Sequence, residues 1–305
     1  MRDMQILPRL SDSISYLYLE QVVVHRCQNT IEAVDDEGRI PIPVANLNVL
    51  MLGPGVSISH AAMNIIGKNG CSVVWVGEEA TRFYAAGVGE TYKAYKIMRQ
   101  AELVSDPAKR KKVVVAMYQK RFDVQLDESL SLPQIRGLEG VRVRDCYKKC
   151  SEEADVEWKG RNYSFQEWGG DPINRALSTA NAVINAVCHV VIVSCGYSPA
   201  LGFIHQGRQL SFVYDVADLY KTELTIPVAF QVVKDGLDQL EKRVRLEIRE
   251  KIRETKLMER ILPDIQSLLD IQEEEEQQHE EFIDPDQAHP FPLWEELFDK
   301  EEVPE

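Results

Sequence analysis

The sequence has 305 residues and contains no uninterrupted run of 18 apolar residues. The apolar stretch from Ala186 to Ser194 is broken by His189 and flanked by polar residues. The first ten residues, MRDMQILPRL, lack the apolar core of a secretory signal peptide. We therefore expect no membrane-spanning segment and a cytoplasmic location.

Cysteine is scarce, and the six cysteines include no CxxC pair. Cys146 and Cys150 lie four residues apart on a predicted helix, and the other cysteines are scattered. This usage favours reduced thiols rather than a disulfide framework. A zinc site built from Cys188, His189 and Cys195 is a chemical alternative, although structural cysteines in a core are the commoner case.

Basic residues are almost missing from the end of the chain. Residues 264–305 hold 16 acidic side chains and one basic side chain, whereas residues 1–263 hold 33 acidic and 34 basic ones. The net charge of −14 therefore belongs to the end of the chain, and the nearly neutral body is compatible with nucleic-acid binding. We predict that residues 272–305 form an acidic, largely disordered tail that binds a partner. Its apolar cluster comprises Phe291, Leu293, Trp294, Leu297 and Phe298.

The apolar pattern changes period near residues 88–90, from two to about 3.6, which divides the chain. Residues 1–88 contain short β-rich runs and a single short helix, which Ser59 is placed to cap. Residues 89–271 have helical periodicity throughout. We predict an α+β multidomain protein, with an N-terminal β-sandwich-like domain and a C-terminal all-α catalytic domain.

Several predicted helices carry clustered basic residues. One begins at Pro107 and contains six of them. Another, or a helix pair, follows residue 237 and includes Arg245 and Arg249. Such charges form either an ordinary solvated face or a patch that neutralises a nucleic-acid backbone.

The stretch GFIHQGRQLSFVYDVADLYK, residues 202–221, places one histidine and two aspartates among apolar residues. Asp215 and Asp218 share a face if VYDVADLYK is helical, and His205 precedes them across a glycine-containing turn. Imidazole and carboxylate groups together can bind a divalent metal. The alternative is that the aspartates are surface charges and His205 is a hydrogen-bonded turn histidine.

A second acidic residue, Glu139, lies between Gly137 and Gly140 on a predicted helix that has Pro133 in its first turn. Two glycines cost the helix about 1 kcal/mol each relative to alanine. The two glycines would allow another group to come close to the helix at this point. That group would be either a substrate backbone or metal, or a neighbouring helix.

Four stretches together resemble CRISPR-associated protein 1, the adaptation integrase, in its type I-E branch. They are GPGVSISHAA, VVWVGE, RGLEGVRVRD and GFIHQGRQLSFVYDVADLYK. The resemblance runs in order from about residue 5 to residue 265. It implies a β domain followed by a helical domain, and a homodimer in complex with CRISPR-associated protein 2. It also implies that the 3′-hydroxyl of foreign double-stranded DNA attacks a phosphodiester of the CRISPR repeat.

The same resemblance assigns residues to the reaction. It implies that Glu139, His205 and Asp218 bind Mg²⁺ or Mn²⁺, that Asp215 orients or joins this site, and that Lys221 contacts a phosphate or leaving group. It matches Arg82 to a DNA contact and Tyr163 and Tyr214 to tyrosines near the site. The expected DNA contacts are therefore Arg82, Tyr163, Tyr214, Arg245 and Arg249.

The sequence departs from some relatives at two positions: Asn185 replaces a tyrosine and Ser57 replaces a basic residue. The first change argues against a tyrosine nucleophile, and the second removes one expected DNA contact. Two other functions remain open. One is a metal-dependent nuclease acting on branched or single-stranded DNA without a donor end, and the other is a non-catalytic DNA-binding adaptor.

Overall fold

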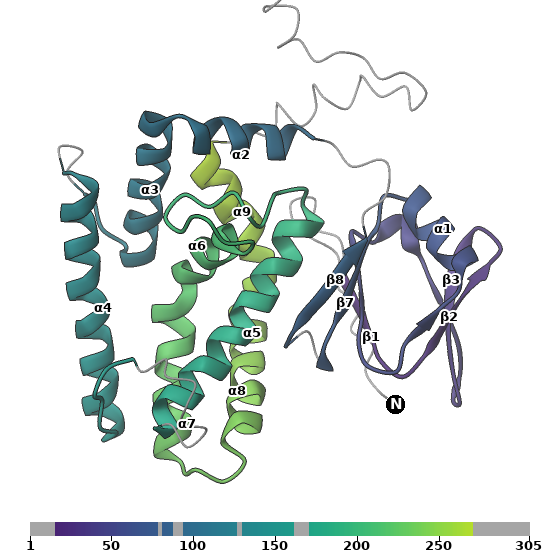
Figure 1. Cartoon of the computed structure of the whole chain (residues 1–305). Helices are drawn as coiled ribbons and strands as arrows, with labels where there is room; N and C mark the ends of the chain where they lie inside the picture. The colour runs from purple at the N-terminus through teal and green to yellow at the C-terminus, as the bar shows by residue number, and fades with distance from the viewer. Residues whose placement is uncertain (1–15, 79–80, 88–93, 127–129, 162–170, 271–305) are drawn as a thin grey trace, which may run out of the picture. The chain divides into compact units, whose positions relative to one another are not determined.

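The computed structural model describes residues 16–78, 81–87, 94–126, 130–161 and 171–270 (Figure 1). The chain divides into two units, Met1–Leu269 and Asp270–Glu305. The predicted tail and Tyr163 lie outside the described residues. The tail and the expected boundary near residue 88 therefore stay predictions.

The N-terminal part contains two four-stranded sheets. In the first, three parallel strands are followed by one antiparallel strand, in the order β1 (Tyr16–Leu19), β5 (Val49–Leu52), β7 (Ser72–Val76) and β8 (Phe83–Gly87). The second has the order β4 (Gly38–Ile42), β3 (Thr30–Asp35), β2 (Val23–Cys27) and β6 (Ser57–Ile58). Its longer pairs, β2 with β3 and β3 with β4, are antiparallel.

One short helix, α1 (His60–Lys68), is inserted in this part. The Ser59 hydroxyl accepts a hydrogen bond from Ala62 N at 3.2 Å, which satisfies a free donor of the first turn. Both sheets and α1 contribute to one apolar core, and all four residues of β5 are buried. The predicted β domain with one inserted helix is confirmed.

The rest of the described chain is helical, apart from its connections. The α-helices are α2 (Tyr95–Ser105), α3 (Pro107–Phe122), α4 (Leu132–Ala154), α5 (Pro172–Ser194), α6 (Ser211–Tyr220), α7 (Ile226–Lys234), α8 (Leu240–Glu254) and α9 (Leu257–Leu269). Helices α3, α4 and α5 each have a proline in the first turn, where its missing N–H costs nothing. This confirms the α+β class.

Helix α5 is the central element of the helical part, and it packs against α6, α7, α8 and α9 (Figure 1). The Asp171 carboxylate caps it by accepting from Ile173 N at 3.3 Å. Within the described residues it is the one helix long and apolar enough to cross a membrane, but 61% of its apolar window is buried inside the protein. Such burial is typical of the core helix of a globular protein.

The chain is irregular at two junctions between helices, α6 to α7 and α8 to α9. Between α6 and α7 the chain forms a π-helical turn, Lys221–Thr225, and Pro227 then occupies the first turn of α7. The C-terminal amphipathic segment is a helix pair, because Lys256 adopts a left-handed φ of 50° between α8 and α9. The π-turn directly follows α6 and begins at Lys221, and such turns are frequent at functional sites.

Candidate metal and DNA site

The connection from α5 to α6, which carries His205, is held by side chains of two other helices. Gln100 of α2 is fully buried. Its amide donates to the carbonyls of Ser198 and Leu201 at 3.0 and 2.9 Å and accepts from Ser198 N at 2.8 Å. Arg110 of α3 donates from Nε to the Phe203 carbonyl at 2.7 Å. These bonds fix the approach to His205.

The Asp215 carboxylate organises the next three residues. It has no exposed surface, and it accepts backbone hydrogen bonds from Phe203, Ile204 and His205 at 2.6, 3.0 and 2.9 Å. A Cβ atom on Gly202 would lie 2.4 Å from the His205 carbonyl oxygen, so glycine is required for this path. Asp215 therefore faces the protein interior and is not available as an open ligand.

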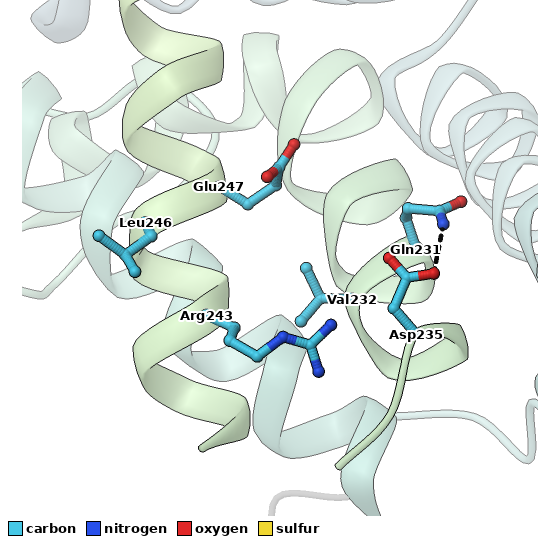
Figure 2. A pocket seen from close by; sticks show the side chains of 6 residues that line it. All are labelled: Gln231, Val232, Asp235, Arg243, Leu246 and Glu247. Atoms are coloured by element: carbon cyan, nitrogen blue, oxygen red, sulfur yellow. Dashed lines mark hydrogen bonds between the residues drawn. The ribbon is translucent and has the colours of Figure 1, made fainter. Parts of the chain in front are cut away.

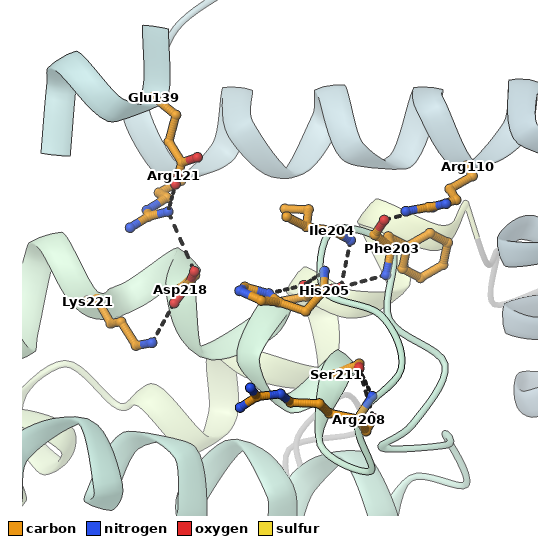
Figure 3. A network of polar contacts seen from close by, with 11 residues as sticks. Arg110, Arg121, Glu139, Phe203, Ile204, His205, Arg208, Ser211, Asp218 and Lys221 are labelled. Atoms are coloured by element: carbon orange, nitrogen blue, oxygen red, sulfur yellow. Dashed lines mark hydrogen bonds and ion pairs between the residues drawn. The ribbon is translucent and has the colours of Figure 1, made fainter. Parts of the chain in front are cut away.

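The same carboxylate orients the imidazole. His205 Nδ1 lies 2.7 Å from Asp215 Oδ1, and the ring meets Tyr214 edge-on with centroids 5.9 Å apart. The hydrogen bond to Asp215 raises the pKa of His205 above its ordinary value, against the opposing effect of burial. With Nδ1 directed at a carboxylate, Nε2 is the ring nitrogen left for a metal. Figure 3 shows the imidazole directed toward Asp218.

Glu139 of α4 and Asp218 of α6 meet at one cation, Arg121 of α3 (Figure 3). Arg121 Nη1 lies 2.5 Å from Glu139 Oε1 and 3.7 Å from Asp218 Oδ2. Lys221 Nζ lies 2.5 Å from Asp218 Oδ1. Sequence positions about 80 residues apart are therefore joined in one charged cluster.

A tyrosine lies beside this cluster, one turn before Arg121 on α3. Tyr118 is only 2% exposed, and its hydroxyl is buried without a hydrogen-bond partner among the described residues. Burial, together with the nearby Glu139 carboxylate, raises the pKa of Tyr118 to about 12. The hydroxyl is therefore a neutral group near Glu139.

The donor chemistry fits a divalent ion. Glu139 and Asp218 supply carboxylates that already share a cation, and His205 supplies an imidazole oriented by a second carboxylate. In the part of the chain that the structure describes, however, no three His, Cys, Asp or Glu side chains lie close enough to hold a metal. The Arg121 guanidinium instead lies between the Glu139 and Asp218 carboxylates.

The alternative zinc site is not formed. Cys188, His189 and Cys195 are not a metal-binding group in the described residues. Burial raises the pKa of the Cys188 thiol and lowers that of His189 to about 4, so both side chains are neutral in the fold. The reason is position: Cys188 is a core residue of α5, as expected for a structural cysteine.

The other expected DNA contacts lie apart from these ligands in the chain. Arg82 is exposed directly before β8, and Arg245 and Arg249 are half-buried on α8. Tyr214 lies against His205, so it belongs to the site itself. A separate pocket lies between α7 and α8, and no predicted site residue lines it (Figure 2). Its lining consists of Gln231, Val232, Asp235, Arg243, Leu246 and Glu247.

Among the described residues, the two glycines beside Glu139 meet no neighbouring helix. A Cβ on Gly137 would have nothing within 4 Å, and one on Gly140 would meet only the Arg144 guanidinium at 3.8 Å. The described part of the chain therefore contains no close helix crossing at this pair, which was one of the two explanations for it. The other explanation, approach by a ligand, stays a prediction.

No metal-ligand pattern in the sequence identifies four residues around the site. They are Gln100, Arg110, Tyr118 and Arg121. A buried glutamine has no sequence signal that separates it from a surface one. Arg110 and Arg121 belong to the basic residues of α3, whose position in a charge-rich helix suggested solvent or DNA. Tyr118 is a buried residue of α3, and an apolar helix face gives no sign of a nearby ligand.

Known proteins resemble the chain over most of its length. The family model described as CRISPR associated protein Cas1 matches residues 16–127 and 118–255. The chain is 46% identical over 297 residues to CRISPR-associated endonuclease Cas1 2 of Thermus thermophilus, covering 96% of this chain and 90% of the relative. It is 36% identical over 262 residues to CRISPR-associated endonuclease Cas1 of Escherichia coli, covering 85% and 86%.

A solved structure described as a TtCas1–DNA complex has the same fold, with a TM-score of 0.80 and 48% identity. The match covers 86% of this chain and 99% of that one. The similarity extends through both the β part and the helical part, including helices α4 and α6, which carry Glu139 and Asp218, and the α5–α6 connection, which carries His205. This chain belongs to the CRISPR-associated Cas1 family.

Proposed function

We propose that this chain is a metal-dependent DNA integrase of CRISPR spacer acquisition. It would join the 3′-hydroxyl ends of short foreign DNA to the CRISPR repeat by transesterification. The observation that supports this most directly is the meeting of Glu139 and Asp218 at one cation, beside an imidazole that Asp215 orients. Membership of the Cas1 family and the likeness to a Cas1–DNA complex support DNA as the substrate.

In this proposal Glu139, His205 and Asp218 bind Mg²⁺ or Mn²⁺. When bound, the metal lowers the pKa of the attacking hydroxyl and neutralises charge on the phosphate and the leaving oxygen. Asp215 keeps the His205 imidazole in the orientation that presents Nε2. Lys221, now paired with Asp218, becomes available to a phosphate oxygen once a metal takes over that carboxylate.

The nucleophile in this reaction is a DNA hydroxyl, so no protein nucleophile is required. Tyr214 packs against His205 and is a positioning residue rather than a covalent one. We further propose that the chain acts in the cytoplasm as a homodimer bound to CRISPR-associated protein 2. The arginines Arg82, Arg245 and Arg249 would contact the phosphate backbone.

The test is a strand-transfer assay with Mg²⁺, CRISPR-associated protein 2, a short duplex and a supercoiled plasmid that carries the repeat. We expect covalently joined, nicked plasmid with a 3′-hydroxyl duplex and none with a 3′-deoxy duplex. Equal cleavage with both duplexes would favour the nuclease suggested by the relatives' description as endonucleases. Binding without any strand cleavage would favour the adaptor.

A further inference from the structure

We infer that Arg121 is an internal counter-cation of the metal site. Its guanidinium holds Glu139 and Asp218 together in the metal-free protein, and a divalent ion must displace it. This inference rests on the proposed function, because it takes Glu139 and Asp218 as metal ligands. Arg121 is a positioning residue in this account and takes no part in the reaction.

The geometry points to a cation placed by the fold rather than a surface ion pair. The Arg121 side chain is 8% exposed, whereas the carboxylates it contacts are 23% and 19% exposed. It comes from α3, and its two partners come from α4 and α6. One side chain therefore links three helices at the point where the predicted ligands converge (Figure 3).

The charges explain why one cation must leave when another enters. Two neighbouring carboxylates repel each other, and a guanidinium between them offsets this repulsion. A divalent ion between the same carboxylates would meet the guanidinium at close range, where repulsion in a partly buried site is strong. The ion and Arg121 therefore compete for Glu139 and Asp218.

The hydrogen bonding of Arg121 is incomplete, which favours release. Its Nε is buried and has no hydrogen-bond partner among the described residues. A buried donor without a partner weakens the hold of the pocket on this side chain. Arg121 therefore lowers the affinity of the site for metal while it keeps the two ligands in place.

The experiment measures Mn²⁺ binding by the full chain, from the electron paramagnetic resonance signal of free Mn²⁺. Wild type is compared with Arg121→Gln, Arg121→Lys, Glu139→Gln and the control Lys120→Gln. Lys120 neighbours Arg121 on α3 and pairs with Asp264 at 2.7 Å, outside the site. Because removing one close positive charge favours a cation strongly, we expect Arg121→Gln to bind Mn²⁺ about tenfold more tightly than wild type. Lys120→Gln should bind it like wild type.

Thermal unfolding gives a second readout. Arg121→Gln should unfold at a lower temperature than wild type in EDTA and should gain more from added Mn²⁺. Mn²⁺ affinity of Arg121→Gln equal to or weaker than that of wild type would overturn the inference. If Arg121→Gln does not fold, Arg121→Lys decides. An ammonium lacks the planar fork that bridges both carboxylates, so Arg121→Lys should bind Mn²⁺ more tightly than wild type, and equal or weaker binding would overturn the inference.

Glu139→Gln separates the two proposals. Mn²⁺ that still binds to Glu139→Gln is held elsewhere, including by the acidic residues after 271. This background is subtracted from the Mn²⁺ binding of the other variants. If Glu139→Gln binds Mn²⁺ as tightly as wild type, the metal site of the proposed function is wrong. If Glu139→Gln loses binding but Arg121→Gln matches wild type, only the counter-cation inference is wrong.

Discussion

At the scale of single residues, the two aspartates of α6 have different tasks although they are three residues apart. Asp215 is buried and serves four donors, three of them backbone N–H groups. Asp218 is partly exposed, and among the described residues its ion-pair partners are Lys221 and Arg121. Asp215 therefore stabilises the backbone of residues 203–205, and Asp218 is free to exchange its cationic partner.

The different surroundings of Asp215 and Asp218 predict that alanine at the two positions changes the free energy of unfolding by different amounts. Asp215→Ala leaves buried backbone donors without an acceptor, so we expect the free energy of unfolding to fall by about 3 kcal/mol. Asp218→Ala should change it by less than about 1 kcal/mol, since its ion pairs are partly solvated. Urea unfolding measures both, with the exposed Asp235→Ala as control. Equal losses for Asp215→Ala and Asp235→Ala would contradict the assignment.

His189 predicts a pH dependence of stability. Burial lowers its pKa from 6.5 to about 4 in the folded protein. Between these values the unfolded chain binds a proton that the folded chain does not bind. The free energy of unfolding should therefore fall as the pH drops from about 6.5 to 4.

The measurement is the difference between wild type and His189→Gln in urea unfolding at several pH values. Above pH 7 the difference should be constant, because His189 is then neutral in both states. Below pH 6.5 wild type should lose stability faster than the variant. Parallel curves over the whole range would show that His189 is not held neutral by the fold.

At the scale of elements, α4 combines a predicted ligand with two glycines that no described residue crowds. Alanine at Gly137 or Gly140 should therefore raise the free energy of unfolding by up to about 1 kcal/mol. Gly67 of α1 is a matched control, because a Cβ there also meets nothing within 4 Å. If a DNA backbone approaches α4, only the α4 substitutions should weaken DNA binding severalfold. Unchanged DNA affinity in both would refute close approach.

Some features of the helices can be predicted from the sequence, and others cannot. Capping by Ser59 and the start of α5 at Pro172 were predictable, because local side-chain chemistry decides them. The π-turn after α6 was not, since its backbone is chosen by tertiary packing around Thr225, which is fully buried and bonded to Asn181 at 2.9 Å. The role of Arg121 was equally hidden, because it depends on a contact with α4 across 18 residues.

At the scale of the whole molecule, charge is divided between a nearly neutral body and an acidic end. An acidic segment repels DNA, so its apolar cluster is better suited to a protein partner. We predict that deleting residues 272–305 weakens binding to CRISPR-associated protein 2 at least about tenfold, because the anchoring side chains are lost. The affinity is measured by calorimetry.

The matched variant keeps the charge and replaces the aromatic residues Phe291, Trp294 and Phe298 by serine. It should weaken partner binding nearly as much as the deletion. Mn²⁺ binding at the Glu139-dependent site should be unchanged in both. An unchanged affinity for the partner after truncation would remove the tail from the interface.

In the proposed function, Glu139, His205 and Asp218 together hold the metal that supports strand transfer. Its most direct test is the strand-transfer assay with Asp218→Ala and His205→Ala, after circular dichroism has verified that both variants are folded. We expect joined product to disappear in each variant while the far-ultraviolet spectrum stays that of wild type. Integration at the wild-type level by either folded variant would contradict it.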